Sequence, residues 1–529
     1  MELESLWSVV PALLAVVLAF SLRKVVVSLG AGVLLGACMA AGWEPWAALL
    51  RLLHYLEVAF TEGSHPWILM FALGLGGFMR LLRETGGGQS LGQRVAGLAR
   101  TRRGGQLAAW GLGLIFFFDD YANTLFVGSS MGPAARRLRL SKEKLAFIID
   151  ATAAPVASLA PLSSWIAMEL GLIAEQLTAL GIARDPYGVF LATIPYRFYP
   201  LLMLVFGLLV AWTGRDFGPM ATAEQRAQRG PAQEDLATEA ASTAATTAGP
   251  LQGGAPGETR LRGLPPLLGL AGLFGMLYWT GRSGALAAEL RVTLANVLSN
   301  ASSSKALVCA TWLASLSGLA VYGRGRPDVW RIYREGVVGM AQPMAVLALA
   351  WALGAVCHDL GTAQALVGLL GDSFAPALLP TMVFLLSSIV SFATGTSWGT
   401  MGILFPLAVP LAHELAPSDM SLLIGTIAAV LSGSVFGDHC SPISDTTIMS
   451  ALAVECDQLA HVQTQLPYAL LVGVVSIGVA GLPVAWGWYS APVGVLLGSL
   501  ALALCLVLLG KRLEQPVSTS AEAAPIGEL

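Results

Sequence analysis

Long apolar stretches are the feature that most restricts what this chain can fold into. Several are about 17 to 22 residues long, enough to cross the hydrocarbon core of a bilayer as helices. They are Leu6 to Leu22, Val25 to Ala41, Pro66 to Leu82, Ala306 to Val321, Pro467 to Trp488 and Pro492 to Leu509. Only 12% of the residues are charged, whereas soluble domains are about a quarter charged. The sequence therefore predicts an all-α integral membrane protein that crosses the cell (inner) membrane several times.

Charge, cysteines and motifs argue against several other classes. A formal net charge of -3 indicates no nucleic-acid partner. The six cysteines form no C-x-x-C pair, so neither a disulfide framework nor a zinc site is predicted. Glu2 and Glu4 replace the basic start of a signal peptide, so we expect the first apolar stretch to be retained. His413 and Glu414 begin an H-E-x-x-H motif, but Pro417 stands at its fifth position, so we predict that the protein is not an enzyme.

A polar, low-complexity stretch divides the chain into two halves that share landmarks in the same order. These landmarks are Lys24 with Lys305, Pro66 with Pro343, Phe118 with Phe392, Pro161 with Pro442, and Pro195-Tyr196 with Pro467-Tyr468. The shared order predicts a duplicated unit. We therefore expect a first transmembrane repeat at 1–214, a flexible linker at 215–262, a second repeat at 263–490, an extra helix at 491–510 and a tail at 511–529.

The distribution of Lys and Arg predicts that the two repeats have inverted topology, because basic residues in short loops stay in the cytoplasm. The segment between Gly105 and Ala135 has basic clusters on both flanks, so we expect it to enter and return as a re-entrant hairpin. Each repeat then has three helices, a re-entrant hairpin, a broken helix and a further helix, an odd number of crossings. One extra C-terminal helix follows. The N-terminus is expected outside, and the linker and C-terminus are expected in the cytoplasm.

Four segments place polar, Gly or Pro residues inside otherwise apolar sequence, two in each half. They are Phe116 to Thr124, Ala160 to Trp165, Phe392 to Gly399 and Gly437 to Thr447. Irregular backbone at membrane depth cannot face lipid, and it persists only around a cavity lined by protein or water. Carbonyls, hydroxyls and carboxylates at such breaks are the oxygen ligands that sodium accepts, whereas helix N-termini favour anions. We therefore expect these breaks to form a binding site.

Buried carboxylates are the costliest groups in these segments, so each needs a partner or a function. Burial favours the protonated form of a carboxylate and a bound cation favours the ionised form, so one group can exchange the two ions. The candidate cation- and proton-binding residues are Asp119, Asp120, Asn123, Thr124, Asp150, Ser163, Ser164, Thr394, Thr396, Ser397, Asp438, His439, Ser441, Ser444 and Asp445. A subset of these is expected to hold Na⁺.

Structural roles remain open for several of these residues. Asp119 and Asp120 could instead cap a helix at a surface loop. Asp150 could be paired with a hairpin amide, and His439 could be a hydrogen-bonded structural residue rather than a proton shuttle. Arg197 could hold the carboxylate of a substrate, reach to the membrane interface or pair with a buried acid.

At these motifs the sequence resembles the NhaC-type sodium/proton antiporter family of elevator-type carriers. The matching stretches begin at Phe117 (FFDDYANT), Asp150 (DATAAPVA), Phe392 (FATGTSWGT) and Gly437 (GDHCSPISDTT). The resemblance covers nearly the whole chain apart from the linker and the termini. It implies sodium coupling and a transport domain, made of the two hairpins and two broken helices, that slides against a scaffold. It also implies a homodimer in the lipid bilayer.

Two hypotheses follow. The first is exchange of sodium for protons, with both ions alternating on the candidate carboxylates and hydroxyls completing the cation shells. The second is a sodium- or proton-coupled carrier of a small organic acid or amino acid. The sequence indicates no cofactor, and Na⁺ and H⁺ are expected as transported ions.

Overall fold

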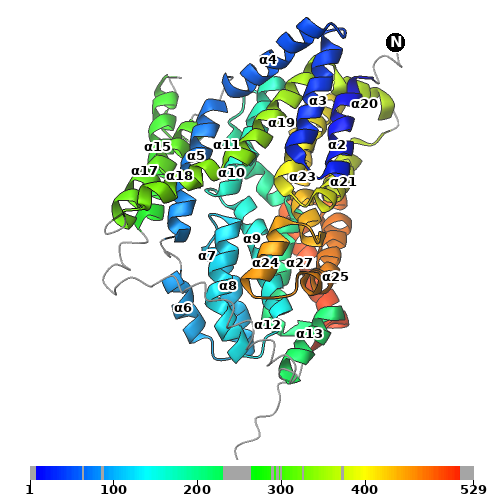
Figure 1. Cartoon of the computed structure of the whole chain (residues 1–529). Coiled ribbons are helices and arrows are strands. Elements are labelled where there is room, and N and C mark those ends of the chain that lie inside the picture. The colour runs from blue at the N-terminus through cyan, green and yellow to red at the C-terminus, as the bar shows by residue number, and fades with distance from the viewer. Residues whose placement is uncertain are drawn as a thin grey trace, which may run out of the picture.

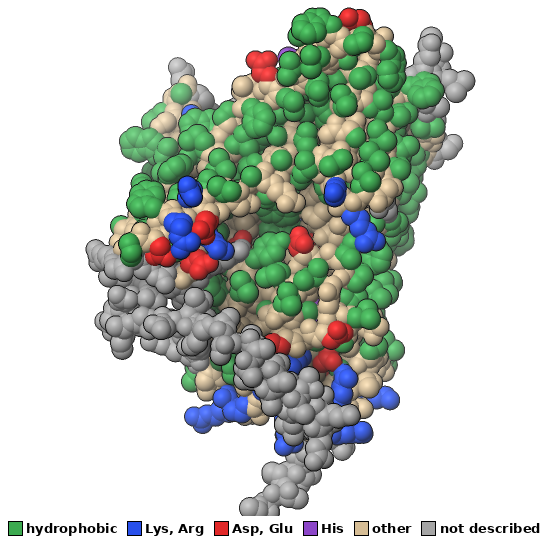
Figure 2. Space-filling view, viewed as in Figure 1, with side chains coloured by type: hydrophobic (Ala, Val, Ile, Leu, Met, Phe, Trp, Pro, Cys, Tyr) green, Lys and Arg blue, Asp and Glu red, His purple; other side chains and the backbone are tan. Residues whose placement is uncertain are grey.

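A computed structural model describes residues 7–61, 65–84, 89–229, 264–287, 291–293, 297, 301–323, 327–370 and 374–512. This part of the chain is almost entirely α-helical (Figure 1). It contains seven helices long and apolar enough to cross a membrane, or up to nine if each of two bent helix pairs is one span. Large apolar side chains cover much of the face shown in Figure 2, as expected of a surface in contact with lipid. The protein is therefore a multi-pass membrane protein.

The first half follows the predicted order of elements. Its helices are α2 (Val10–Leu22), α3 (Val25–Ala40), α4 (Pro45–Thr61), α5 (His65–Glu84), α6 (Gln89–Leu98), α7 (Arg102–Ile115), α8 (Asp120–Arg137), α9 (Lys142–Leu159), α10 (Ser164–Ala179), α11 (Pro186–Thr193) and α12 (Phe198–Thr213). The pair α7 and α8 forms the hairpin. The pair α9 and α10 forms the broken helix, with a bend of 45°.

The second half repeats this order. Its helices are α15 (Leu264–Ala287), α17 (Ser303–Tyr322), α18 (Val329–Gly339), α19 (Ala341–Asp359), α20 (Thr362–Leu370), α21 (Leu379–Thr394), α22 (Ser397–Leu415), α23 (Met420–Cys440), α24 (Asp445–Ala453), α25 (Gln458–Val475), a π-helical turn η5 (Ser476–Gly481) and α26 (Leu482–Ala485). In Figure 1, α9 lies below α10 but α23 lies above α24, so the two broken helices run in opposite directions. The extra helix α27 (Ala491–Leu509) follows, and the predicted fold is confirmed.

The hairpin tips form where local caps end one helix and begin the next. Asp119 begins α8 by accepting a hydrogen bond from the backbone N–H of Ala122 at 2.7 Å. In the second hairpin, Gly395 ends α21 in the left-handed region with a φ of 68°. A Cβ on Gly395 would lie 2.5 Å from the carbonyl oxygen of Ile443, so only glycine fits this tip.

The linker region differs from the prediction at its start. Residues 215–229 are structured: β1 (Arg215–Asp216) pairs antiparallel with β2 (Lys511–Arg512), and α13 (Gly218–Arg229) follows. Strands of two residues and a short amphipathic helix leave little trace in a low-complexity sequence. The rest of the predicted linker, and residues 513–529 of the predicted tail, lie outside the described residues.

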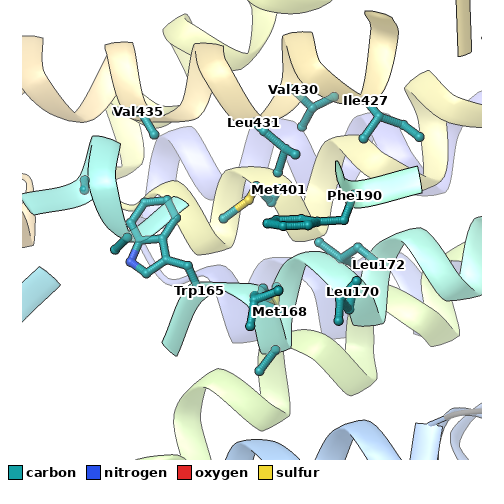
Figure 3. Packing of buried hydrophobic residues seen from close by; sticks show 14 of the residues in the cluster. Trp165, Met168, Leu170, Leu172, Phe190, Met401, Ile427, Val430, Leu431 and Val435 are labelled. Carbon is teal, nitrogen blue, oxygen red and sulfur yellow. The ribbon is translucent and has the colours of Figure 1, made fainter. Parts of the chain in front are cut away.

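The helices divide into two groups that pack against each other. In Figure 1, α2 to α5 and α15 to α19 form the upper group, and the hairpins and broken helices lie below and beside it. Side chains of α10, α11, α22 and α23 interdigitate in a tightly packed core, among them Trp165, Met168, Phe190, Met401 and Leu431 (Figure 3). This core fixes the positions of α10 and α23 beside the two breaks.

Candidate functional site

The two hairpin tips and the two helix breaks meet around one cavity of about 850 Å³. The backbone N–H of Ser164 donates to the carbonyl of Phe118 at 2.9 Å, which joins the first tip to the first break. The hydroxyl of Ser441 donates to the carbonyl of Phe392 at 2.8 Å, which joins the second tip to the second break. Figure 2 shows the hollow at mid-height, with acidic side chains in it. The four segments singled out in the sequence are therefore one site.

Asp438 lies in the last turn of α23 and is 3% exposed. Its Oδ1 accepts a hydrogen bond from the Ser391 hydroxyl at 2.9 Å, and its Oδ2 accepts one from the Ser397 backbone N–H at 3.1 Å. The Ser397 hydroxyl also donates to Oδ2. Within the described residues, no Lys, Arg or His forms an ion pair with Asp438. An isolated anion at this depth is costly, so this carboxylate needs a proton or a bound cation.

Asp119 and Asp120 are both buried and both line the cavity. Asp119 caps α8, so the capping role left open by the sequence is its structural role. Asp120 lies in the first turn of α8, where its Oδ1 accepts from the backbone N–H of Tyr121 at 3.0 Å. Capping and cavity lining are compatible here, because the cap lies at the tip of the hairpin.

Asp445 is the most exposed carboxylate of the site. It begins α24 and faces the cavity, and its Oδ2 accepts a hydrogen bond from the Tyr121 hydroxyl at 3.4 Å. This contact joins the first hairpin to the second broken helix. The cavity is thus built from both halves of the chain, and carboxylates from both halves face it.

The candidate hydroxyl and amide residues fall into two groups. Ser164, Thr394, Thr396 and Ser397 line the cavity together with the carboxylates. Asn123, Thr124, Ser163, Ser441 and Ser444 lie beside it, and their side chains bond backbone or neighbouring groups of the tips and breaks. The amide of Asn123, for example, donates to the carbonyl of Gly113 at 2.6 Å and closes the first hairpin. Their predicted role in cation binding stays a prediction.

Asp150 and His439 lie away from the cavity, and both are 0% exposed. A hairpin amide was the structural partner left open for Asp150, but its partners come from α24 and α25. The amide of Gln465 donates to Asp150 Oδ2 at 2.6 Å, and His461 Nε2 lies 3.5 Å from the same oxygen. The ring Nδ1 of His439 lies 2.9 Å from the Tyr199 hydroxyl.

Arg197 is fully buried and its charge is compensated. Its Nη2 lies 2.8 Å from Glu169 Oε2, its Nε donates to the Thr193 hydroxyl at 3.0 Å, and its Nη1 donates to the carbonyl of Ser158. Of the three roles left open by the sequence, the structure selects the pairing with a buried acid. Arg197 therefore supports the last turn of α9 and does not face the cavity.

Several site residues were not found from the sequence. Ser391 lies one turn before the second tip, and Tyr121 lies between two candidates without being singled out. His461 and Gln465 are four residues apart, which places them on one face of a helix. That spacing was the available signal, but a polar pair in an apolar helix does not reveal its partner.

Basic residues surround the cavity mouth and also gather elsewhere. Arg23, Lys24 and Arg80 line the mouth from the upper helix group, and Arg80 Nη2 lies 3.5 Å from Glu335 Oε2. Figure 2 shows a second gathering of Lys and Arg side chains at the lower end of the molecule. The basic residues therefore lie at two heights.

Comparisons with known proteins agree with a transporter. Residues 156–482 match the model of the Na+/H+ antiporter family. An uncharacterized protein of Haemophilus influenzae is 34% identical over 486 residues, which is 90% of each chain. The malate-2H(+)/Na(+)-lactate antiporter of Bacillus subtilis is 28% identical over 32% of this chain and 36% of its own. The solved YdaH transporter of Alcanivorax borkumensis superposes with a TM-score of 0.55 at 18% identity, covering 83% of this chain and 90% of its own.

Proposed function

Because the chain belongs to the Na+/H+ antiporter family and is a secondary transporter, we propose that it exchanges sodium ions for protons across the cell membrane. Asp438 carries this proposal. In the described structure this buried carboxylate is bonded only to neutral donors. A bound proton neutralises its charge, and a bound sodium ion neutralises it as well. Two ions that satisfy the same requirement are ions that one site can exchange.

The neighbouring groups suit a small hard cation. The hydroxyls of Ser391 and Ser397 already contact the carboxylate as donors, and the lone pairs of a donating hydroxyl oxygen can still accept a cation. Thr394 and Thr396 line the same part of the cavity. Oxygen ligands of this kind are what sodium accepts at the broken helices of transporters.

We further propose an elevator-type movement. The hairpins and broken helices carry the site, and α3, α5, α18 and α19 form the opposite wall of the cavity. Alternating access then results when the first group slides against the second. With basic residues retained in the cytoplasm, the cavity mouth at Arg23 and Lys24 faces the cytoplasm in this structure, and α13 lies on the same side. We propose that the carrier is a homodimer, as the family resemblance implies.

The size of the cavity supports a second candidate function. A volume of about 850 Å³ far exceeds what one ion needs, since a water molecule occupies only about 30 Å³ in the liquid. A small organic acid or amino acid would fit beside the cation, and the Bacillus subtilis relative is named for malate and lactate. Arg197 does not hold the carboxylate of such a solute, because it is paired with Glu169.

Reconstitution into proteoliposomes with an internal pH dye separates the two candidates. For simple exchange, an imposed sodium gradient moves protons without any added solute. If protons move only after an organic acid or amino acid is added, simple exchange is wrong and the second candidate is correct. Proteoliposomes that respond to neither condition would contradict both.

Asp438→Asn tests the site within the first candidate. An amide cannot ionise, so we expect Asp438→Asn to abolish sodium-driven proton flux. Asp359→Asn is the matched control, because Asp359 lies at the exposed end of α19. Membrane insertion is checked by yield and by size-exclusion profile in detergent. Wild-type flux in Asp438→Asn would show that the site is elsewhere.

A further inference from the structure

A second cavity, of about 600 Å³, lies at the base of the second hairpin. Within the described structure it shares no lining residue with the cavity that the carboxylates face. Its walls come from the first halves of α21 and α23, from η5 and α26, and from the start of α27. π-helical turns such as η5 are rare and are frequently found at functional sites. The proposed ion exchange makes no use of this space.

The interior of this cavity is mostly apolar. Phe384 of α21, Ala429 of α23 and Val484 of α26 line it. The hydroxyls of Tyr199 and Ser476 also line it, but one bonds a histidine ring and the other bonds a backbone carbonyl one turn before it. Water enters a cavity only where polar partners hold it, so an apolar cavity stays dry or binds an apolar ligand. We therefore expect an apolar occupant.

The mouth of the cavity lies at the membrane surface opposite to α13. The last residue of α27, Leu509, lies next to β2, which pairs with β1 directly before α13. The 19 residues of α27 span about 28 Å, close to the ~30 Å thickness of a hydrocarbon core. The start of α27 is therefore in the other leaflet. There the exposed residues Asp419, Ser421 and Ser490 line the cavity, at the level of lipid headgroups.

Two walls of the cavity belong to helices that face lipid. On α21, Leu385 and Ile389 are exposed, and on α27, Leu496 and Leu500 are exposed. Large apolar side chains on the outside of a membrane protein are in contact with acyl chains. An acyl chain of the surrounding bilayer can therefore reach the cavity along apolar surface, with its headgroup at the mouth.

The polar groups at the mouth suit a headgroup that carries both charges. Asp419 is the one charged side chain among the described lining residues. Its Oδ1 accepts from the backbone N–H groups of Ser421 at 2.9 Å and Leu422 at 3.1 Å, and its Oδ2 accepts no hydrogen bond within the described residues. The start of α27 has no side-chain cap, so its first N–H groups can donate to a phosphate. An ammonium group beside Asp419 and a phosphate beside α27 match these charges.

We propose that this cavity binds an acyl chain of a phospholipid with an ammonium headgroup, such as phosphatidylethanolamine, from the leaflet opposite to α13. The chain packs against Phe384 of α21 and Ala429 of α23. Ser391 and Asp438 lie about two turns farther along the same two helices. The lipid thus completes the packing of the hairpin that carries the ligands of Asp438. This inference goes beyond ion exchange and does not depend on which solute is carried.

Gly425→Phe tests the binding of the chain. Gly425 lines the cavity, and a Cβ there would lie 3.7 Å from the Pro380 Cγ, an ordinary contact, so the ring can occupy the space. Delipidated protein in detergent receives phosphatidylethanolamine with palmitoyl and oleoyl chains. Native mass spectrometry measures the lipid retained, and tryptophan fluorescence measures the melting temperature.

We expect the wild-type protein to retain one lipid per chain and to melt several degrees higher with it, because a ligand of the folded state stabilises that state. Gly425→Phe should retain at least about tenfold less lipid, since several methylene groups lose their buried position. Its melting temperature should no longer respond to lipid. Gly275→Phe is the matched control, because Gly275 is exposed on α15 and a Cβ there meets nothing within 4 Å.

Asp419→Asn tests the headgroup, because asparagine caps a helix as well as aspartate does but carries no charge. The wild-type protein should be stabilised more by phosphatidylethanolamine than by phosphatidylglycerol with the same chains, which lacks the ammonium group. Asp419→Asn should lose this difference. Equal stabilisation of the wild-type protein by the two lipids would show that Asp419 does not select the headgroup.

Two outcomes overturn the inference as a whole. Wild-type protein that neither retains phosphatidylethanolamine nor melts higher with it has no such site. If Gly425→Phe retains the lipid like the wild-type protein, the lipid is bound elsewhere. If Gly425→Phe does not insert, Ala485→Phe, which lines the cavity from α26, is judged by the same two measurements. Failure of the proposed ion exchange is distinguishable, because it leaves these lipid measurements unchanged.

Discussion

At the scale of single residues, the hydroxyl groups around Asp438 are as informative as the carboxylate. Ser391 and Ser397 come from the two helices of the second hairpin, and together with the Ser397 backbone N–H they hold both carboxylate oxygens. Movement of the hairpin tip therefore changes the ligands of Asp438 directly. For the proposed cation site, we expect the affinity for sodium to depend on whether the hairpin is closed against α23.

Ser397→Ala should weaken cation binding without preventing transport. A hydrogen bond to a charged group contributes about 1.5–3 kcal/mol, so the half-saturating sodium concentration should rise by about tenfold or more. The maximal rate should change far less. Ser388→Ala is the matched control, because the Ser388 hydroxyl bonds only the Phe384 carbonyl of its own helix in the described structure. Equal effects of the two variants on half-saturation would contradict the assignment.

At the scale of elements, α13 fixes the base of the first hairpin against the first broken helix. Glu224 of α13 is 1% exposed. It accepts a hydrogen bond from the backbone N–H of Ser141, which caps α9, and it pairs with Arg102 at the start of α7. One carboxylate thus ties α7 to α9, so the hairpin and the broken helix form one connected unit.

Glu224→Ala should destabilise this unit. Removal of the carboxylate leaves the buried N–H of Ser141 without its partner, which costs about 1–3 kcal/mol. We expect a melting temperature lowered by several degrees, measured by tryptophan fluorescence in detergent. Gln225→Ala, at the exposed neighbouring position, should leave it unchanged. If both variants melt like wild type, the contact of α13 is not stabilising.

The elements near the site differ in how far the sequence could predict them. Prolines, glycines and aspartates in apolar surroundings are local signals, and from them the sequence predicted both hairpins and both helix breaks. The partners of Asp150 could not be found in this way, because Thr447, Ser450, His461 and Gln465 are about 300 residues away along the chain. The short helix α13 was also missed, because its stability comes from Glu224 and its tertiary contacts rather than from its composition.

At the scale of the whole molecule, the contact between the two helix groups is lined by small residues. A Cβ on Gly171 of α10 would lie 3.0 Å from Leu347 and Trp351 of α19. A Cβ on Gly402 of α22 would lie 3.4 Å from the Cβ of Ala350, which is also on α19. The glycines thus let the backbones of α10 and α22 approach α19 closely, and Trp351 of α19 donates a hydrogen bond to the Gly171 carbonyl at 2.9 Å.

A disulfide across this contact should stop transport. In a background without the six native cysteines, Gly402→Cys with Ala350→Cys places the two Cβ atoms about as close as a disulfide needs. Oxidation should abolish flux and a reductant should restore it. Gly269→Cys with Ala314→Cys is the matched control, since it joins α15 to α17 within one group. Undiminished flux in fully cross-linked protein would exclude sliding along this contact.

The two heights of basic side chains in Figure 2 have a consequence for the surrounding lipid. A flat bilayer has one cytoplasmic surface, so basic residues of both groups cannot lie at that surface at the same time. Under the proposed cytoplasmic orientation, we expect the leaflet to bend or thin where the lower group projects beyond the upper one, at a cost of a fraction of a kcal/mol per ångström of mismatch, on the order of the value for transmembrane helices in general. If the carrier moves as proposed, we expect acyl-chain length to favour one of its end positions over the other, so that lipid thickness changes the rate of transport.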